Sequence, residues 1–163
     1  MRRLGWSLLL AALLLGACGE GRAPTGEPAP EIEVERLDGS RVRLSDLRGR
    51  WVLLDFWATW CPPCVLEIPE LNRLHRRHAG DSFEILAVSL DEGPAAKLAS
   101  WLEEHDVRYP VAVGDLELAE RFGAYQFPFH VLIGPDGTIL ERLDPGFHDH
   151  EELEALLRRH RPG

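Results

Sequence analysis

The stretch of residues 51–64 reads WVLLDFWATWCPPC and carries the strongest structural signal in the chain. Its first half, Trp51 to Trp57, is apolar except for Asp55, which is typical of a central strand buried on both faces. Its second half ends in Cys61-Pro62-Pro63-Cys64, and apolar side chains then recur at helical spacing to about His78. We therefore expect a strand, a sharp turn and a helix, with both cysteines at the junction.

Strand and helix patterns alternate along the rest of the chain. Alternating apolar and polar residues at 32–37 and 42–44 flank Asp38-Gly39, which is a strong hairpin signal. Apolar runs bounded by turn residues predict strands, and helical apolar spacing predicts helices. This order indicates an α/β domain with an N-terminal hairpin and a mixed central sheet flanked by helices. The further predicted strands are 83–90, 109–113, 129–133 and 138–143, and the further predicted helices are 94–105, 115–122 and 151–160.

Length and charge narrow the range of functions. The chain has 163 residues, of which 45% are hydrophobic, and this is enough for one packed domain and a short leader. The formal net charge is -9, and the Arg residues are interspersed with acidic ones. Because phosphate binding requires clustered Lys and Arg, we exclude a nucleic-acid partner.

Residues 1–17 are typical of an export signal. Arg2 and Arg3 precede an apolar core at 8–15 that is too short to span a bilayer. Leu15-Gly16-Ala17-Cys18 resembles the lipobox of bacterial lipoproteins, so we expect a lipoprotein signal peptide and lipidation of Cys18. The alternative is an ordinary signal peptide followed by an incidental free cysteine. The predicted location is the bacterial cell envelope, with the exported protein membrane-anchored and facing the periplasm or the cell exterior.

The segment after Cys18 carries no hydrophobic period. Residues 18–30 are rich in Gly, Pro, Ala and Glu, which predicts a flexible tether. Removal of the basic leader makes the mature chain more acidic, so we expect attachment through lipid rather than through a basic surface. The globular domain is expected at residues 31–163.

Cys61 and Cys64 have the spacing of a redox-active pair. The positive end of the helix dipole stabilises a thiolate at Cys61, which can attack a disulfide, and Cys64 then resolves the mixed disulfide. We expect Cys61 to be exposed and Cys64 to be shielded. Pro62 and Pro63 have no N–H group, which leaves the N–H of Cys64 as the main backbone donor to the Cys61 sulfur.

Two other interpretations of the cysteine pair are weaker. A structural disulfide between these positions would close only a small loop and would stabilise the fold little. Zinc normally takes four ligands, and no second cysteine pair exists. We therefore expect a site without metal or cofactor.

Residues 52–64 resemble the signature of thioredoxin-like proteins, and in particular that of the TlpA/ResA-like envelope branch. Two neighbouring motifs match the same branch, Glu67-Ile68-Pro69-Glu70-Leu71 after the cysteines and LSDLRGR at 44–50 before the strand. Segment 91–113 matches its central helix–strand insert. The resemblance covers nearly all of residues 31–159, and it implies a thioredoxin fold and thiol–disulfide oxidoreductase activity.

The resemblance also implies roles for residues around the pair. Cys61 is the nucleophile, Cys64 is the resolving thiol, and Pro128 is a cis-proline beside them; a trans proline at a strand edge is the alternative. The usual Gly-x-Pro-x-Thr pattern of this loop is replaced here by QFPFH at 126–130, which bears on substrate preference. Trp60 is expected to pack against the pair and to form part of an apolar contact surface.

Two acidic residues are candidate proton carriers. Asp55 matches the buried aspartate of thioredoxins, although many members of the envelope branch have Asn there, and burial is expected to raise its pKa toward a value suited to deprotonating Cys64. Glu67 matches a glutamate that tunes the pair in this branch. The alternatives are a hydrogen-bonded core acid at Asp55 and a solvated helix residue at Glu67. His130 is expected to be an ordinary strand residue.

Together these features predict a disulfide reductase that uses Cys61 and Cys64, acts on disulfide-containing exported proteins and is re-reduced by a membrane electron donor. The resemblance adds an apocytochrome awaiting haem as a client. One alternative is a disulfide-forming oxidant, which only the reduction potential distinguishes. Another is a non-enzymatic copper carrier that uses both cysteines and His130. A peroxidase would need a Thr-x-x-Cys loop, for which Thr59 is misplaced.

Overall fold

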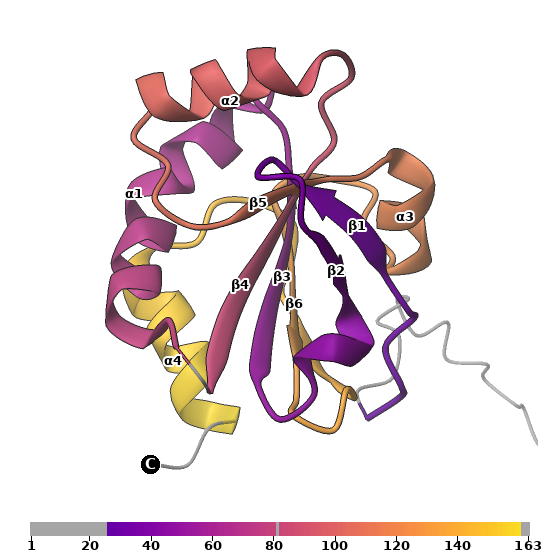
Figure 1. Cartoon of the computed structure of the whole chain (residues 1–163). Helices are drawn as coiled ribbons and strands as arrows, with labels where there is room; N and C mark the ends of the chain where they lie inside the picture. The colour runs from indigo at the N-terminus through magenta and orange to yellow at the C-terminus, as the bar shows by residue number, and fades with distance from the viewer. Residues whose placement is uncertain (1–25, 81, 161–163) are drawn as a thin grey trace, which may run out of the picture.

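The computed structural model describes residues 26–80 and 82–160 (Figure 1). Its regular elements follow the predicted order and add one short 3-10 helix before the first long strand. The strands are β1 (Glu33–Arg36), β2 (Arg41–Arg43), β3 (Trp51–Trp57), β4 (Phe83–Ser89), β5 (Val111–Val113), β6 (Phe129–Ile133) and β7 (Ile139–Arg142). The helices are α1 (Pro62–His78), α2 (Ala95–Glu104), α3 (Leu116–Arg121) and α4 (His150–His160), and the 3-10 helix is η1 (Leu44–Leu47).

All seven strands form one mixed sheet in the order β2-β1-β5-β4-β3-β6-β7. Strands β3, β4 and β5 run parallel, whereas β6 runs antiparallel to β3. Strand β3 is central, because it pairs along its whole length with β4 and along most of it with β6. The predicted α/β fold is confirmed, with the cysteine-bearing turn directly after the central strand.

Helices cover both faces of this sheet. Figure 1 shows α1 and α4 along one face and α3 on the other. Alternate residues of β3 reach the two layers: Trp57 contacts Trp101 of α2 with ring centroids 5.8 Å apart, and Phe56 contacts Phe122 at the end of α3 at 5.6 Å. Asp55 shares the face of Trp57, and its side chain therefore lies on the side covered by α1.

Local sequence signals act as expected. The hairpin β1–β2 turns at Gly39, whose φ of +82° suits a residue without a side chain. Helix α3 begins after Asp115, whose Oδ1 accepts a hydrogen bond from the Leu118 N–H at 2.8 Å. Within the described residues, no helix combines the length and apolarity needed to cross a bilayer.

The start of the folded region differs from expectation. Residues 26–29 were predicted to belong to the flexible tether, but they pair with the outer edge of the sheet at β7. The Gly26 N–H donates to the Ile139 carbonyl at 2.7 Å, the Ile139 N–H donates to the Glu27 carbonyl at 2.8 Å, and the Ala29 N–H donates to Gly137 at 2.9 Å. An edge strand has unpaired backbone groups, and this segment satisfies them. The predicted signal peptide at 1–17 and Cys18 lie outside the described residues.

Candidate active site

The two cysteines lie where the chain leaves β3 and enters α1. Cys61 is the N-cap residue of α1 and is joined to Cys64 by a disulfide, with Cα atoms 5.3 Å apart. The Cys61 carbonyl accepts the first helical hydrogen bond from the Val65 N–H at 3.1 Å. Pro62 and Pro63 occupy the first helical positions, where a missing N–H group costs no helical hydrogen bond. In this disulfide state no side-chain hydrogen bond caps the helix, so donation from the Cys64 N–H to a Cys61 thiolate stays a prediction.

The expected exposure of Cys61 is wrong for the disulfide state. Cys61 is 5% exposed and Cys64 is 2% exposed. Cys64 lies on the buried face of α1, and the bond between the sulfur atoms turns Cys61 inward toward it. Trp60, which is 60% exposed, is the side chain that projects from this turn.

Asp91 fixes the approach to the redox turn, and sequence reasoning did not assign it this role. Its carboxylate accepts hydrogen bonds from the Thr59 N–H at 2.9 Å, from the Thr59 hydroxyl, and from the Ser89 hydroxyl at 2.8 Å. Asp91 lies two residues after the end of β4, and Thr59 lies two residues after the end of β3. Because β3 and β4 are parallel neighbours, their carboxyl ends meet at one edge of the sheet. An Asp directly after the predicted strand 83–90 was the available signal.

The loop before β6 lies beside the redox turn. The Phe127–Pro128 peptide bond is cis, as predicted. The Phe127 ring meets Trp60 edge to face, with ring centroids 6.3 Å apart. The Pro128 carbonyl accepts a hydrogen bond from the Gly146 N–H at 3.0 Å, which connects this loop to the segment before α4. Two segments distant in sequence therefore share one surface with the cysteine pair.

Exposed apolar side chains gather around this surface. The large hydrophobic residues that remain exposed include Trp60, Leu66 of α1, and Phe147, which follows the Gly146 that binds Pro128. A cavity of about 810 Å³ lies against Trp60. Its lining includes Thr59, Trp60, Asp91, Glu92, Leu116 and Glu117. Exposed apolar groups beside a reactive group are typical of a protein-binding surface.

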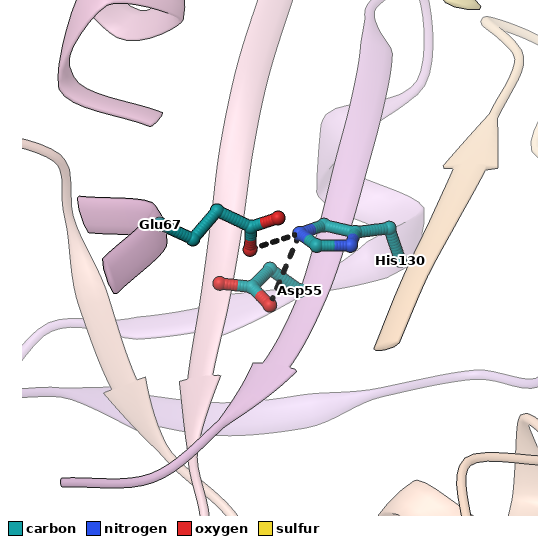
Figure 2. Close-up of side chains that lie close together, drawn as sticks. All are labelled: Asp55, Glu67 and His130. Carbon is teal, nitrogen blue, oxygen red and sulfur yellow. Dashed lines mark ion pairs between the residues drawn. The ribbon is translucent and has the colours of Figure 1, made fainter. Parts of the chain in front are cut away.

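Three ionisable side chains from β3, β6 and α1 lie close together in the protein interior (Figure 2). Asp55 and His130 are cross-strand partners in β3 and β6, and Glu67 approaches them from α1. His130 Nε2 lies 3.1 Å from Glu67 Oε2 and 3.5 Å from Asp55 Oδ1. Asp55 and Glu67 are each 1% exposed, and His130 is fully buried. We refer to Asp55, Glu67 and His130 as the buried triad.

Burial and mutual attraction set the protonation of the triad. Burial raises the pKa of Asp55 to about 7; the positive charge of His130 opposes this shift, and the negative charge of Glu67 adds to it. Burial lowers the pKa of His130, but the carboxylates of Glu67 and Asp55 outweigh burial, so the net direction is upward. At neutral pH the triad therefore contains an imidazolium at His130 and a carboxyl group at Asp55 that titrates readily.

Glu67 differs from the alternative of a solvated helix residue. Its Oε1 accepts a hydrogen bond from the backbone N–H of His148 at 2.7 Å, and its Oε2 faces His130. The rings of His130 and His148 meet edge to face at 5.6 Å. Glu67 is thus fixed from two sides inside the protein, and its position connects α1 to the segment before α4.

The triad also presents metal-ligand atoms that lie within 4.8 Å of one another. It is the one such group of three or more His, Cys, Asp or Glu residues among residues 26–80 and 82–160, and neither cysteine belongs to it. It offers three donors where a closed structural zinc site takes four, and it is fully enclosed. We interpret it as a proton-sharing cluster. The Nε2 atom of His130 faces carboxylates, so a copper site made of His130 and both cysteines is not assembled in this structure.

Fold and site together define a class: a thioredoxin-fold protein with one redox-active cysteine pair at the start of α1. The chain belongs to the AhpC/TSA family, whose profile matches residues 25–142. It is 30% identical to the thiol–disulfide oxidoreductase ResA of Bacillus thuringiensis subsp. konkukian, with 98% of both chains aligned. It is 31% identical to ResA of Bacillus subtilis strain 168, over 76% of this chain and 69% of the relative. The chain is accordingly a thiol–disulfide oxidoreductase.

Solved structures agree with this assignment. The thioredoxin domain of a thiol–disulfide oxidoreductase from Bacteroides vulgatus superposes with a TM-score of 0.73 at 26% identity, covering 85% of this chain and 98% of that domain. The exposed lipoprotein thioredoxin of Streptococcus pneumoniae strain TIGR4 superposes with a TM-score of 0.69 at 29% identity, covering 80% of this chain and 99% of the other. The predicted thioredoxin fold is confirmed.

Proposed function

We propose that this protein reduces disulfides in exported proteins. The observation that carries the proposal is the Cys61–Cys64 disulfide at the start of α1, one turn from a buried triad that can take up a proton. Nucleophile, resolving thiol and proton acceptor are the three parts that disulfide exchange requires. The relatives named as thiol–disulfide oxidoreductases support the same chemistry.

The proposed reaction begins with the reduced pair. The Cys61 thiolate attacks one sulfur of the client disulfide, the client S–S bond breaks, and the departing client thiolate takes a proton from solvent. The Cys64 thiol then loses its proton and attacks the Cys61 sulfur of the mixed disulfide. The second client sulfur leaves with its bonding electrons. Two electrons have passed from the cysteine pair to the client, and the pair is left in the disulfide state described above.

Client binding would use the surface around Trp60 and Phe127. Among the described residues, the N–H and carbonyl of Phe127 have no hydrogen-bond partner, so they are free to pair with an extended client segment. Trp60 before the cysteine pair and Leu66 after it in sequence are both exposed and offer apolar contact. This arrangement supports a protein disulfide rather than a small disulfide as the substrate.

Export and anchoring are part of the proposal. The leader at 1–17, Cys18 within a lipobox-like motif and the following tether support a lipoprotein of the cell envelope. The solved pneumococcal relative is named an exposed lipoprotein thioredoxin, which is consistent with this location. We infer that a membrane electron donor re-reduces the pair and that apocytochrome c is a candidate client. Intact-mass analysis of the protein from its membrane tests the anchor, and a cleaved but unacylated chain would contradict it.

The reduction potential separates this proposal from a disulfide-forming oxidant. Equilibration of the Cys61–Cys64 pair with dithiothreitol or glutathione buffers measures it directly. We expect a value well below the roughly -120 mV of strong oxidants. A value near that of strong oxidants, together with net disulfide formation in a reduced client, would reverse the assigned direction.

A further inference from the structure

The buried triad contains a cation that the exchange reaction proposed above does not itself require. Two carboxyl groups within reach of one histidine nitrogen cannot both be ionised in an enclosed site unless a positive charge accompanies them. His130 is the one described cationic side chain paired with both Asp55 and Glu67. Its position in a strand whose other residues are all apolar makes this pairing specific.

The triad lies within one helical turn of the resolving cysteine. Glu67 follows Cys64 by three residues in α1, so the two side chains are neighbours on the same face of the helix. Both are almost completely buried on that face. From Glu67 the contacts run to His130 and then to Asp55, as Figure 2 shows. The cluster thus begins one helical turn from the residue whose sulfur must lose a proton.

Asp55 is the member of the triad that can accept the proton lost by Cys64. Neither of its oxygens accepts a hydrogen bond from a described residue, although the side chain is enclosed. Both carboxyl groups face His130, but among the described residues only Glu67 also accepts a hydrogen bond, from the His148 N–H to its Oε1. An enclosed carboxyl group without donors is the one that gains and loses a proton most readily near neutral pH, because little stabilises its charge.

We propose that His130 is a positioning residue in a buried proton relay, where its imidazolium keeps Asp55 able to accept the proton that Cys64 releases when the cysteine pair closes. The inference rests on the proposed exchange reaction. In the closing step the Cys64 S–H proton passes to the Asp55 carboxylate, the Cys64 sulfur bonds to the Cys61 sulfur, and the client sulfur leaves with the electron pair. The proton then passes from Asp55 to solvent or to the departing client thiolate.

Other titratable groups facing the triad do not take over this role. Tyr109 is buried nearby, and burial together with the charges of Asp55 and Glu67 raises its pKa, so it stays neutral. The imidazole of His148 is engaged away from the triad, with Nδ1 near Glu152 Oε2 and Nε2 near the Asp144 carbonyl. Its backbone N–H reaches the triad at Glu67, and its ring meets the His130 ring edge to face at 5.6 Å, while both of its ring nitrogens face other partners.

The first test needs no variant and no activity. Nitrogen NMR of the reduced, full-length wild-type protein follows the His130 imidazole between pH 5 and 10. We expect both ring nitrogens to carry protons at pH 7. A neutral His130 ring at pH 7 overturns the proposal, whether or not the protein proves to be a reductase. A protonated ring in a protein that fails to reduce disulfides would instead refute the proposed function.

The second test is the pH profile of the closing step, measured by single-turnover reduction of a peptide disulfide. In wild type we expect the rate to rise with a midpoint near the pKa of Asp55, which is about 7. His130→Gln should move this midpoint upward by about 1 to 2 pH units, lowering the rate at pH 7 by about 5- to 50-fold but leaving the rate at pH 9 at about half of the wild-type rate or more. The control His105→Gln, at the exposed C-cap residue of α2, should change neither the midpoint nor the rate.

A uniform loss of rate at every pH, or an unchanged midpoint, overturns the proposal because it indicates a purely structural histidine. His130→Lys retains a positive charge at the same strand position and should keep the midpoint within about half a unit of wild type. A midpoint in His130→Lys that moves as far as in His130→Gln also counts against the proposal.

Discussion

Trp60 and Phe127 meet edge to face, with ring centroids 6.3 Å apart, although 66 positions separate them in the chain. This contact joins the redox turn to the loop that carries the cis-proline. Trp60 remains 60% exposed, so the contact leaves most of the indole available to a partner. Client binding should therefore depend on this aromatic pair more than on the net charge of the protein.

Trp60→Ala should weaken client binding with little effect on folding. An exposed aromatic at the centre of a protein contact often contributes more than about 1 kcal/mol, which corresponds to a loss of about fivefold or more in affinity. We expect a higher KM for a protein client and an unchanged rate with a small disulfide. The matched variant Trp60→Phe retains a ring and should lose less. Equal losses with protein and small substrates would contradict a docking role.

Cys64→Ser should accumulate a mixed disulfide between Cys61 and a client. The reason is that the first thiolate can still attack, whereas no second thiol remains to release the client. Non-reducing electrophoresis followed by mass spectrometry identifies both the bond and the client. Cys61→Ser is the control and should trap nothing. Trapping in that control instead would reverse the roles of the two cysteines.

Asp55→Asn should stabilise the protein in a pH-dependent way. An ordinary Asp has a pKa of 3.8, whereas burial raises that of Asp55 to about 7. Between these values the folded state binds more protons than the unfolded state, so the stability contributed by protonated Asp55 is lost as the pH rises. We expect the free energy of unfolding of the variant to exceed that of wild type by on the order of 3 kcal/mol at pH 8 and by much less at pH 4.

Urea denaturation at both pH values measures this difference. The control Asp46→Asn changes an exposed acid in η1 and should have little effect at either pH. An equal gain for Asp55→Asn at pH 4 and pH 8 would show that ionisation is not the cause.

Asp91→Asn should loosen the turn before the cysteines. The carboxylate accepts three hydrogen bonds from Thr59 and Ser89, and the amide of Asn replaces one acceptor oxygen by a donor. We expect a loss of about 1 to 3 kcal/mol in the free energy of unfolding and faster hydrogen exchange at the Thr59 amide. The neighbouring variant Glu92→Gln is the control, since Glu92 is exposed. Unchanged exchange at Thr59 would argue against this anchoring role.

Much of the fold was predictable from local sequence patterns. The apolar run of β3 and the hairpin turn at Gly39 were predicted because period, length and turn chemistry act within a few residues. The 3-10 helix η1 was not assigned as a helix, because a four-residue element carries too little periodicity. The pairing of residues 26–29 with β7 was also missed, since Gly- and Pro-rich sequence gives no strand signal even where a sheet edge offers partners.

The cysteine pair, the cis peptide bond at Pro128 and the burial of Asp55 were predictable from the sequence, but the assembly of the buried triad was not. Asp55 and His130 become neighbours only through the pairing of β3 with β6, and Glu67 joins them only when α1 packs on that face. One signal was present: Asp55 and His130 are each the single polar residue of an otherwise apolar strand core. Buried polar groups need partners, so two such strands side by side favour a pair.

The pairing of residues 26–29 with β7 also limits the distance between the folded domain and the membrane. If Cys18 is the lipid anchor, as we propose, the chain between lipid and folded domain is residues 18–25 rather than 18–30. A fully extended chain spans at most about 3.5 Å per residue, so the maximum length of the connecting segment falls from about 45 Å for residues 18–30 to about 28 Å for residues 18–25. Electron donor and client must then meet the enzyme close to the membrane surface, and disulfides held farther away are beyond its reach.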